Sequence, residues 1–174
     1  GIGFIDGRFF VLDRNGKEVF SGEKKGHIIK GISISNNGQF SAIHYGNESS
    51  DTVVIKYGKG KSYTANLAKI HNKLEKNKYS FHVTKSMSYI TNSGKYLFLD
   101  KNRIILFNKK CNVLFTIKIQ EKKDGQASIS FLKNIFFITF TTLSGSSRFL
   151  VISEQGEIIL SKEFRSESYL HCIV

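Results

Sequence analysis

The sequence predicts an all-β fold of repeated four-stranded antiparallel sheets, and three observations support this prediction. The 174 residues include 15 glycines and no proline, so Gly and Asn must make the turns, as they do in β-hairpins. The 15 Phe and 7 Tyr favour pleated, half-buried surfaces. Short apolar segments separated by polar turns recur along the chain in the same order.

The most regular repeat consists of an apolar strand, a polar turn and a second apolar strand. Four copies can be read, at residues 8–20, 52–67, 103–117 and 148–160. Their turns close on Gly16, Gly60, Asn112 and Gly156, which are 44, 52 and 44 residues apart. Gly and Asn tolerate a positive φ, so we expect the backbone geometry to repeat as well. A strand-built repeat of roughly 40–50 residues is typical of propeller blades.

A second predicted hairpin precedes each of the last three copies. In residues 32–35 apolar and small polar side chains alternate, as a half-buried strand requires, and the hairpin that follows is almost continuously apolar. Two hairpins per repeat give four antiparallel strands, which make one propeller blade. The predicted full blades are residues 31–67, 87–119 and 127–164, and the predicted partial blades are residues 8–22 and 168–174.

The predicted core follows the apolar strand positions of these blades. It comprises Phe10, Leu12, Ile32, Ile34, Ile43, Val54, Tyr89, Leu97, Leu99, Ile105, Phe107, Ile129, Phe131, Phe137, Phe149 and Val151. One segment, residues 69–85, breaks the repeat. Leu67, Ile70 and Leu74 fall at i, i+3 and i+7, so a short amphipathic helix between Leu67 and Asn77 is one interpretation. A basic loop between blades is the other.

Several turn-and-strand segments carry a resemblance to a known fold family. They are Asn36-Asn37-Gly38-Gln39-Phe40, Asn92-Ser93-Gly94-Lys95-Tyr96 and the units that close on Gly16 and Gly156. The pattern resembles the WD-repeat-like and related bacterial β-propellers over nearly the whole chain. The chain has no Trp and so lacks the Trp-Asp dipeptide of true WD repeats, while Gly26-His27 partly matches their Gly-His opening. The resemblance implies a propeller architecture and no specific function.

The charge of the chain limits the classes of partner. Lys and Arg number 26 against 14 Asp and Glu, which gives a net charge of +12. Such a field attracts acidic proteins, nucleic acids or anionic membranes, although the even spread of the lysines also fits a plain lysine-coated surface. No apolar run approaches ~18 residues, so the sequence predicts no membrane-spanning helix.

The sequence contains none of the common motifs for catalysis, metals or cofactors. The five histidines follow no metal-ligand spacing, and there is no Gly-x-Ser-x-Gly, phosphate-binding loop or Cys-x-x-Cys. We therefore expect no catalytic residue, cofactor or metal. The two cysteines cannot form a disulfide framework. Cys111, in a predicted turn, is expected to be an exposed thiol, and Cys172 a core residue.

Two groups of residues are candidate binding sites. The first is an edge next to a polar loop, because propeller faces are built from loops. It consists of His44, Tyr45, Asn47 and Asp51. The second is a basic patch interleaved with aromatic rings, which suits phosphate contact and base stacking. It consists of Lys56, Tyr57, Lys59, Lys61 and Tyr63. For each group, a solvated loop or edge without a ligand is the competing interpretation.

The sequence favours a non-catalytic protein-interaction scaffold that presents loops from a propeller face. One alternative is part of a propeller enzyme, a hydrolase or lyase whose active site lies in missing blades. The other is a binder of nucleic acid or an anionic surface through a basic face, whose affinity would fall steeply with salt. The favoured partner is another protein. An acidic protein would suit the charge, and nucleic acid is less favoured.

Three full and two partial blades are too few to close a propeller, which needs about four to eight. Residues 1–174 are therefore expected to be either one propeller-like domain completed by a second copy, or a fragment of a longer propeller. The missing blades of the same chain would complete the fragment. An open ring would expose unpaired strands and apolar faces, which favour association.

Overall fold

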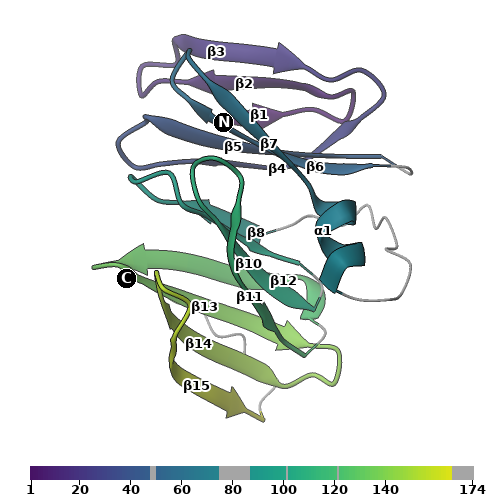
Figure 1. Ribbon diagram of the computed structural model, residues 1–174, viewed down its shortest axis with the longest axis vertical. Coiled ribbons are helices and arrows are strands. Elements are labelled where there is room, and N and C mark those ends of the chain that lie inside the picture. Colours follow the sequence, from purple (N-terminus) through teal and green to yellow (C-terminus); the bar gives the residue numbers. More distant parts are fainter. Residues whose placement is uncertain (48–49, 75–86, 101, 121, 166–174) are drawn as a thin grey trace. The chain divides into compact units, whose positions relative to one another are not determined.

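The strands predicted from the sequence form separate antiparallel sheets. The computed structural model describes residues 1–47, 50–74, 87–100, 102–120 and 122–165. In each sheet that these residues form, every strand pairs with the next strand along the chain (Figure 1). One sheet has three strands and the other three have four, which confirms the predicted all-β fold of repeated sheets. The partial blade predicted at residues 168–174 lies outside the described residues.

The first sheet contains one strand that the sequence did not predict. Its strands are β1 (Ile2–Gly3), β2 (Arg8–Leu12) and β3 (Glu18–Glu23), in that order. The β2–β3 hairpin agrees with the partial blade predicted at residues 8–22. The additional strand, β1, is only 2 residues long. A strand of that length shows no alternation, because alternation must run over about four residues to be read.

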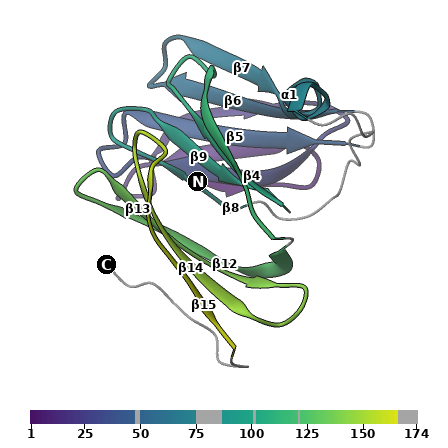
Figure 2. The same ribbon diagram turned by 60° about the horizontal axis from the view of Figure 1, so that its bottom comes forward.

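The second sheet agrees closely with the blade predicted at residues 31–67. Its strands are β4 (Ile28–Ile34), β5 (Phe40–Gly46), β6 (Asp51–Tyr57) and β7 (Ser62–Asn66). The helix α1 (Leu67–Leu74) follows β7 directly and contacts β6 and β7 (Figure 2). The side-chain oxygen of Asn66 accepts a hydrogen bond from the N–H of Lys69 at 2.9 Å, which caps the helix. The helical interpretation therefore holds as far as Leu74, and residues 75–77 lie outside the described residues.

The third and fourth sheets agree with the blades predicted at residues 87–119 and 127–164. The third contains β8 (Met87–Ile90), β9 (Tyr96–Leu99), β10 (Arg103–Phe107) and β11 (Val113–Lys118). The fourth contains β12 (Lys122–Leu132), β13 (Ile135–Thr142), β14 (Ser147–Ser153) and β15 (Ile158–Phe164). The early start of β12 was not predicted, because its first residues, Lys122 to Gln126, are polar or glycine.

The chain divides into two compact units, which we call the first unit and the second unit. The first unit holds the sheets β1–β3 and β4–β7, α1, and residues 90–96 and 108–112, which include two turns of the third sheet. The second unit holds the rest of the third sheet and the sheet β12–β15. The core of the first unit joins β2 to β5 and contains Phe9, Val11, Ile43 and Tyr45. The core of the second unit contains Leu97, Leu99, Ile104, Leu106, Phe136, Ile138, Phe140, Leu150 and Ile152.

The predicted core is correct on some strands and shifted by one residue on others. Six of the predicted residues are buried, namely Ile43, Leu97, Leu99, Ile105, Phe107 and Val151. The other ten are only half-buried, namely Phe10, Leu12, Ile32, Ile34, Val54, Tyr89, Ile129, Phe131, Phe137 and Phe149. On β2 the buried residues are instead Phe9 and Val11. Because β2 is apolar on both faces, the period of two could not decide which face is covered.

The same turn recurs at the corresponding place of each repeat. The N–H of its first residue donates to the carbonyl four residues on, and the N–H of its fourth residue donates back to the first. Turns of this kind begin at Asp13, Tyr57, Asn108 and Ser153. The fourth residues Gly16 and Gly156 have φ of 80° and 93°. In the third sheet Cys111 takes this place with a φ of 61°, and not Asn112 as predicted, while the second sheet has its positive φ at Gly58.

Candidate interaction site

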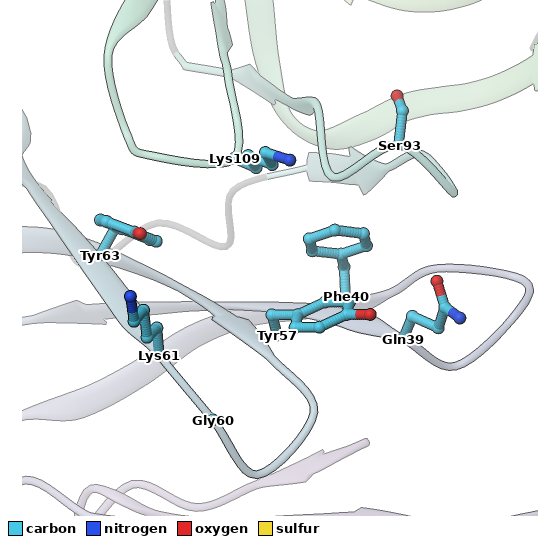
Figure 3. A pocket seen from close by; sticks show the side chains of 8 residues that line it. All are labelled: Gln39, Phe40, Tyr57, Gly60, Lys61, Tyr63, Ser93 and Lys109. Carbon is cyan, nitrogen blue, oxygen red and sulfur yellow. The ribbon is translucent and has the colours of Figure 1, made fainter.

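The first unit contains a pocket of about 720 Å³. The lining residues lie in or next to four turns. Two of these turns belong to the second sheet, and the other two are the turns of the third sheet that belong to this unit. The lining residues are Gln39, Phe40, Tyr57, Gly60, Lys61, Tyr63, Ser93 and Lys109. Figure 3 shows the rings of Phe40 and Tyr57 next to one another, with Lys61 and Tyr63 on one side and Gln39 on the other. We call it the aromatic–lysine pocket.

Antiparallel pairing in the second sheet builds one side of this pocket. The β4–β5 turn and the β6–β7 turn lie at the same end of the sheet, because both are hairpin turns of adjacent antiparallel pairs. Phe40 begins β5 and pairs with Tyr57 at the end of β6. The centroids of the two rings lie 4.9 Å apart, at an interplanar angle of 47°. The N–H of Gly58 donates to the carbonyl of Gln39 at 2.9 Å and so joins the two turns.

The two turns of the third sheet build the other side. The N–H of Asn37 donates to the side-chain oxygen of Asn92 at 3.0 Å. The thiol of Cys111 lies 3.1 Å from the carbonyl oxygen of Tyr63, to which it donates. The backbone of Gly94 lies so close to Phe40 that a Cβ at this position would be 2.6 Å from the ring. Side-chain, backbone and van der Waals contacts therefore hold these turns where Ser93 and Lys109 line the pocket.

The pocket is apolar at its base and positively charged at its rim. The side chain of Phe40 is buried, whereas Tyr57 is 53% exposed although its ring packs on Phe40. The side chains of Lys61 and Lys109 are exposed, and neither forms an ion pair with any described residue. Among the eight lining residues there is no Asp or Glu. The pocket can therefore hold an apolar group next to a negatively charged one.

Searches for sequence relatives and for similar structures gave different results. No family model matches the chain, and no curated protein matches it. A protein of unknown function from Bacteroides caccae is similar in structure at 12% identity and a TM-score of 0.53, over 90% of this chain and 54% of that chain. Sqt1 from Chaetomium thermophilum is similar at 16% identity and a TM-score of 0.57, over 91% of this chain and 42% of that chain. The chain has a β-propeller fold.

At these identities the likeness concerns the fold alone. The resemblance to WD-repeat-like and bacterial propellers that the sequence suggested is confirmed at that level, and the four-stranded sheets are blades. The chain spans about half the length of the two solved structures. The aromatic–lysine pocket lies among the turns of these blades, where propellers place the residues of their faces.

The predicted basic patch is divided by the structure. Tyr57, Lys61 and Tyr63 line the pocket. Lys56 lies elsewhere, because its ammonium group is 4.6 Å from the centroid of the Phe20 ring in a cation–π contact. Lys59 is exposed in the β6–β7 turn and does not line the pocket. Binding at this patch stays a prediction, now centred on three of its five residues.

The predicted binding edge contributes mostly buried side chains. His44, Tyr45 and Asp51 are buried, and burial raises the pKa of Tyr45 to about 12. The carboxylate of Asp51 accepts hydrogen bonds from the ring of His44 and, at 3.2 Å, from the ammonium group of Lys30. Asn47 is half-buried and donates to the carbonyl of Gly26 at 3.1 Å. His44 and Asp51 therefore bind each other, and Asn47 binds the backbone. Binding of a partner at this edge stays an untested prediction.

Sequence reasoning missed the half of the pocket that comes from distant turns. Phe40 was expected only as the start of a strand, and Ser93 and Lys109 only as turn residues. A signal was nevertheless present, because Gln39 and Ser93 lie in equivalent first hairpins of their repeats, and Lys61 and Lys109 in or next to equivalent second-hairpin turns. Equivalent turns of adjacent blades gather on one face of a propeller. If the repeats had first been arranged as adjacent blades, the sequence would have predicted that these turn residues lie close together.

The remaining expectations from the sequence concern the two cysteines, metal ligands and membrane-spanning helices. Cys111 is buried and not exposed as expected, and burial raises its pKa to about 11. Cys172 lies outside the described residues. Within the described ranges, no three side chains of His, Cys, Asp or Glu are grouped as metal ligands. No helix in the same part of the chain is long and apolar enough to cross a membrane.

Proposed function

We propose that this chain is a non-catalytic protein-interaction module that binds its partner at the turns around the aromatic–lysine pocket. One observation carries the proposal: exposed lysines and a half-exposed tyrosine surround a preformed cavity of about 720 Å³. A cavity of this size lies within the range of about 300–1,000 Å³ that ligands commonly fill in proteins. The β-propeller fold supports a protein-interaction role in general terms.

The aromatic side chains of the pocket have the properties of interface anchors. Tyr and Phe are enriched at the centres of protein interfaces, where they lose contact with water on binding. Tyr57 is 53% exposed and rests on the buried ring of Phe40, so its ring is already oriented before a partner arrives. An oriented side chain loses little rotamer entropy on binding. Tyr57 is therefore the residue on which we expect most of the binding energy to depend.

The two alternative functions receive less support from the pocket. None of its lining residues is His, Cys, Asp or Glu, and the hydroxyl of Ser93 is hydrogen-bonded to that of Thr91 at 2.8 Å and not to a lysine of the pocket that could act as its base. A hydrolase or lyase site would have to lie elsewhere. Lysines and tyrosines would also suit nucleic acid, and this alternative is included in the experiments below.

A peptide-display selection on the purified chain tests the proposal. We expect a family of related peptides to be enriched on the unmodified chain and to lose binding to a Tyr57→Ala variant. The matched control is Leu143→Ala, which removes a side chain that is 58% exposed in a turn of the second unit. Circular dichroism and thermal melting establish that both variants fold. If no peptide is enriched, or if enriched peptides bind Tyr57→Ala as well as the unmodified chain, the proposal is wrong.

A further inference from the structure

We infer that the aromatic–lysine pocket recognises an acidic peptide segment with one apolar anchor. An aromatic or leucine side chain of the partner enters the pocket against Phe40 and Tyr57, and neighbouring Asp or Glu carboxylates pair with Lys61 and Lys109. This inference rests on the proposed function and adds the chemistry of the partner. It depends on the geometry of the rings, the local charge and the kind of cation that the pocket presents.

The rings define the part of the partner that is apolar. Phe40 is 8% exposed and Tyr57 is 53% exposed, with their centroids 4.9 Å apart. The Tyr57 ring thus has one side supported by protein and much of its remaining surface in water. An apolar side chain that fills the pocket would remove this surface from water, and burial of apolar area is the main driving force for association. A hydrophilic segment alone would leave that surface hydrated.

The charge near the pocket has one sign. The turn segments around it are residues 35–41, 56–64, 91–96 and 107–112. They contain no Asp or Glu, and their lysines are Lys56, Lys59, Lys61, Lys95, Lys109 and Lys110. The equivalent turns of the first and last sheets differ, since residues 13–18 include Asp13 and Glu18, and residues 153–157 include Glu154 and Glu157. The uniform positive charge is therefore a local feature of the pocket and complements an acidic partner.

The pocket suits carboxylates in a protein better than phosphates in a nucleic acid. Its cations are lysines, and the four turn segments contain no Arg, the residue that binds phosphate and guanine through two parallel hydrogen bonds. Single-stranded nucleic acid is bound on aromatic rings that offer open faces to successive bases. Here the Phe40 ring is buried and is tilted by 47° from Tyr57, so the two rings do not form such a platform.

Synthetic probes measured by fluorescence anisotropy test the inference. The first probe is a labelled nine-residue peptide with a central phenylalanine between two pairs of glutamates. Its two partners replace all glutamates by glutamine, or the phenylalanine by alanine. We expect the glutamate peptide to bind about tenfold more tightly at low salt than either of the other two peptides. The glutamine peptide lacks the two exposed ion pairs, and the alanine peptide lacks the apolar anchor. The difference between the glutamate and glutamine peptides should shrink as salt rises.

Charge-neutralising variants locate the effect. Lys61→Gln and Lys109→Gln should each weaken the glutamate peptide by about two- to fivefold and leave the glutamine peptide unchanged. Lys162→Gln is the control, because it removes the same charge from an exposed position on β15 of the second unit and should change neither affinity. All three substitutions affect exposed side chains, so we expect each variant to fold.

Each remaining outcome contradicts the inference in a recognisable way. Equal affinity for the glutamate and glutamine peptides, with both lost in Tyr57→Ala, would overturn the acidic preference and leave the proposed function in place. Binding of an oligothymidine probe that Lys61→Gln and Tyr57→Ala both weaken, without binding of any peptide, would assign the pocket to nucleic acid. If no probe binds and the peptide-display selection yields nothing, both the inference and the proposed function are wrong.

Discussion

Asp51 shows at the scale of single residues how this chain places charge inside a blade. Its carboxylate lies between the ring of His44 and the ammonium group of Lys30, and the side chains of all three are only 2–3% exposed. Gly46 provides space for the Lys30 side chain, since a Cβ there would be 2.1 Å from its Cε. A buried charge is tolerated only when it is paired and hydrogen-bonded. The sequence could not distinguish this arrangement from a solvated loop, because both use the same polar residues.

Removing the carboxylate of Asp51 should destabilise the protein strongly. In an Asp51→Asn variant the ammonium group of Lys30 remains buried without its anionic partner, and we expect a loss of about 3–5 kcal/mol in the free energy of unfolding. Urea denaturation measures this loss. Asp6→Asn is the control, because the Asp6–Arg8 pair at 2.7 Å is exposed and screened by water and should contribute little to the free energy of unfolding. Equal losses in the two variants would show that Asp51 does not balance a buried charge.

The thiol of Cys111 should react slowly in the folded protein. Burial raises its pKa from 9.0 to about 11, so that the reactive thiolate is scarce at pH 8. On a Cys172→Ser background, we expect the rate of alkylation by iodoacetamide to rise with pH as far as about 11. The same chain in urea is the control, and its rate should level off near pH 9. Fast alkylation of the folded protein at pH 8 would contradict the buried position of Cys111.

At the scale of strands and turns, the sequence predicted where elements begin and end better than which face they bury. Turn residues bound each strand, and the second blade was therefore placed within a few residues of β4–β7. The choice of face failed on β2, where Phe9 and Val11 are buried and the predicted Phe10 and Leu12 are half-buried. A strand that is apolar at successive positions has no periodic signal for its orientation.

The candidate site was predicted in the same partial way. The segment from Lys56 to Tyr63 is local in sequence, and its mixture of lysines and tyrosines could be recognised directly. Phe40 and Lys109 lie 69 residues apart and meet at one pocket only because two blades place their turns in the same unit. A site made of residues so far apart in the sequence can be predicted only if the repeats are first arranged in space. His44 and Asp51 show the opposite case, because their polar character suggested an exposed edge and both side chains are buried.

Two glycine turns with the same backbone conformation test how the pocket is held together. Gly16 and Gly94 have φ of 80° and 81°, so alanine at either position should cost about 1 kcal/mol for the left-handed backbone. A Cβ at Gly16 would meet nothing within 4 Å, whereas a Cβ at Gly94 would lie 2.6 Å from the Phe40 ring. We therefore expect Gly94→Ala to lose a further 1–3 kcal/mol, about the cost of overpacking a core.

Urea unfolding of the two alanine variants measures the difference between these turns. The Gly16→Ala variant controls for backbone strain, because the two positions differ in the neighbouring side chain and hardly in φ. If Gly94→Ala were no less stable than Gly16→Ala, then the turn at residues 91–95 would not pack against Phe40. The pocket would in that case lack the wall that Ser93 provides, and both proposals for its function would lose their geometric basis.

At the scale of the whole molecule, the repeat specifies the architecture and leaves the function to individual turns. The net charge of +12 is spread along the chain and does not identify a partner. The turns of equivalent blades nevertheless differ in charge: those beginning at Asp13 and Ser153 carry acidic residues, and those around the pocket do not. Propellers of unrelated function share their blades and differ in such turns. The binding specificity of this chain should therefore change with turn substitutions that leave its stability almost unchanged.

The number of blades leads to a prediction about association. Propellers close with about four to eight blades, and the described residues form three sheets of four strands and one of three. A sheet without a neighbouring blade leaves an apolar face in water, so we expect the isolated chain to associate with a second copy unless further blades of a longer chain cover such faces. Light scattering over a range of concentrations measures the molar mass, and it should be done at high salt because the charge of +12 opposes self-association. A monomer at all concentrations would overturn the prediction.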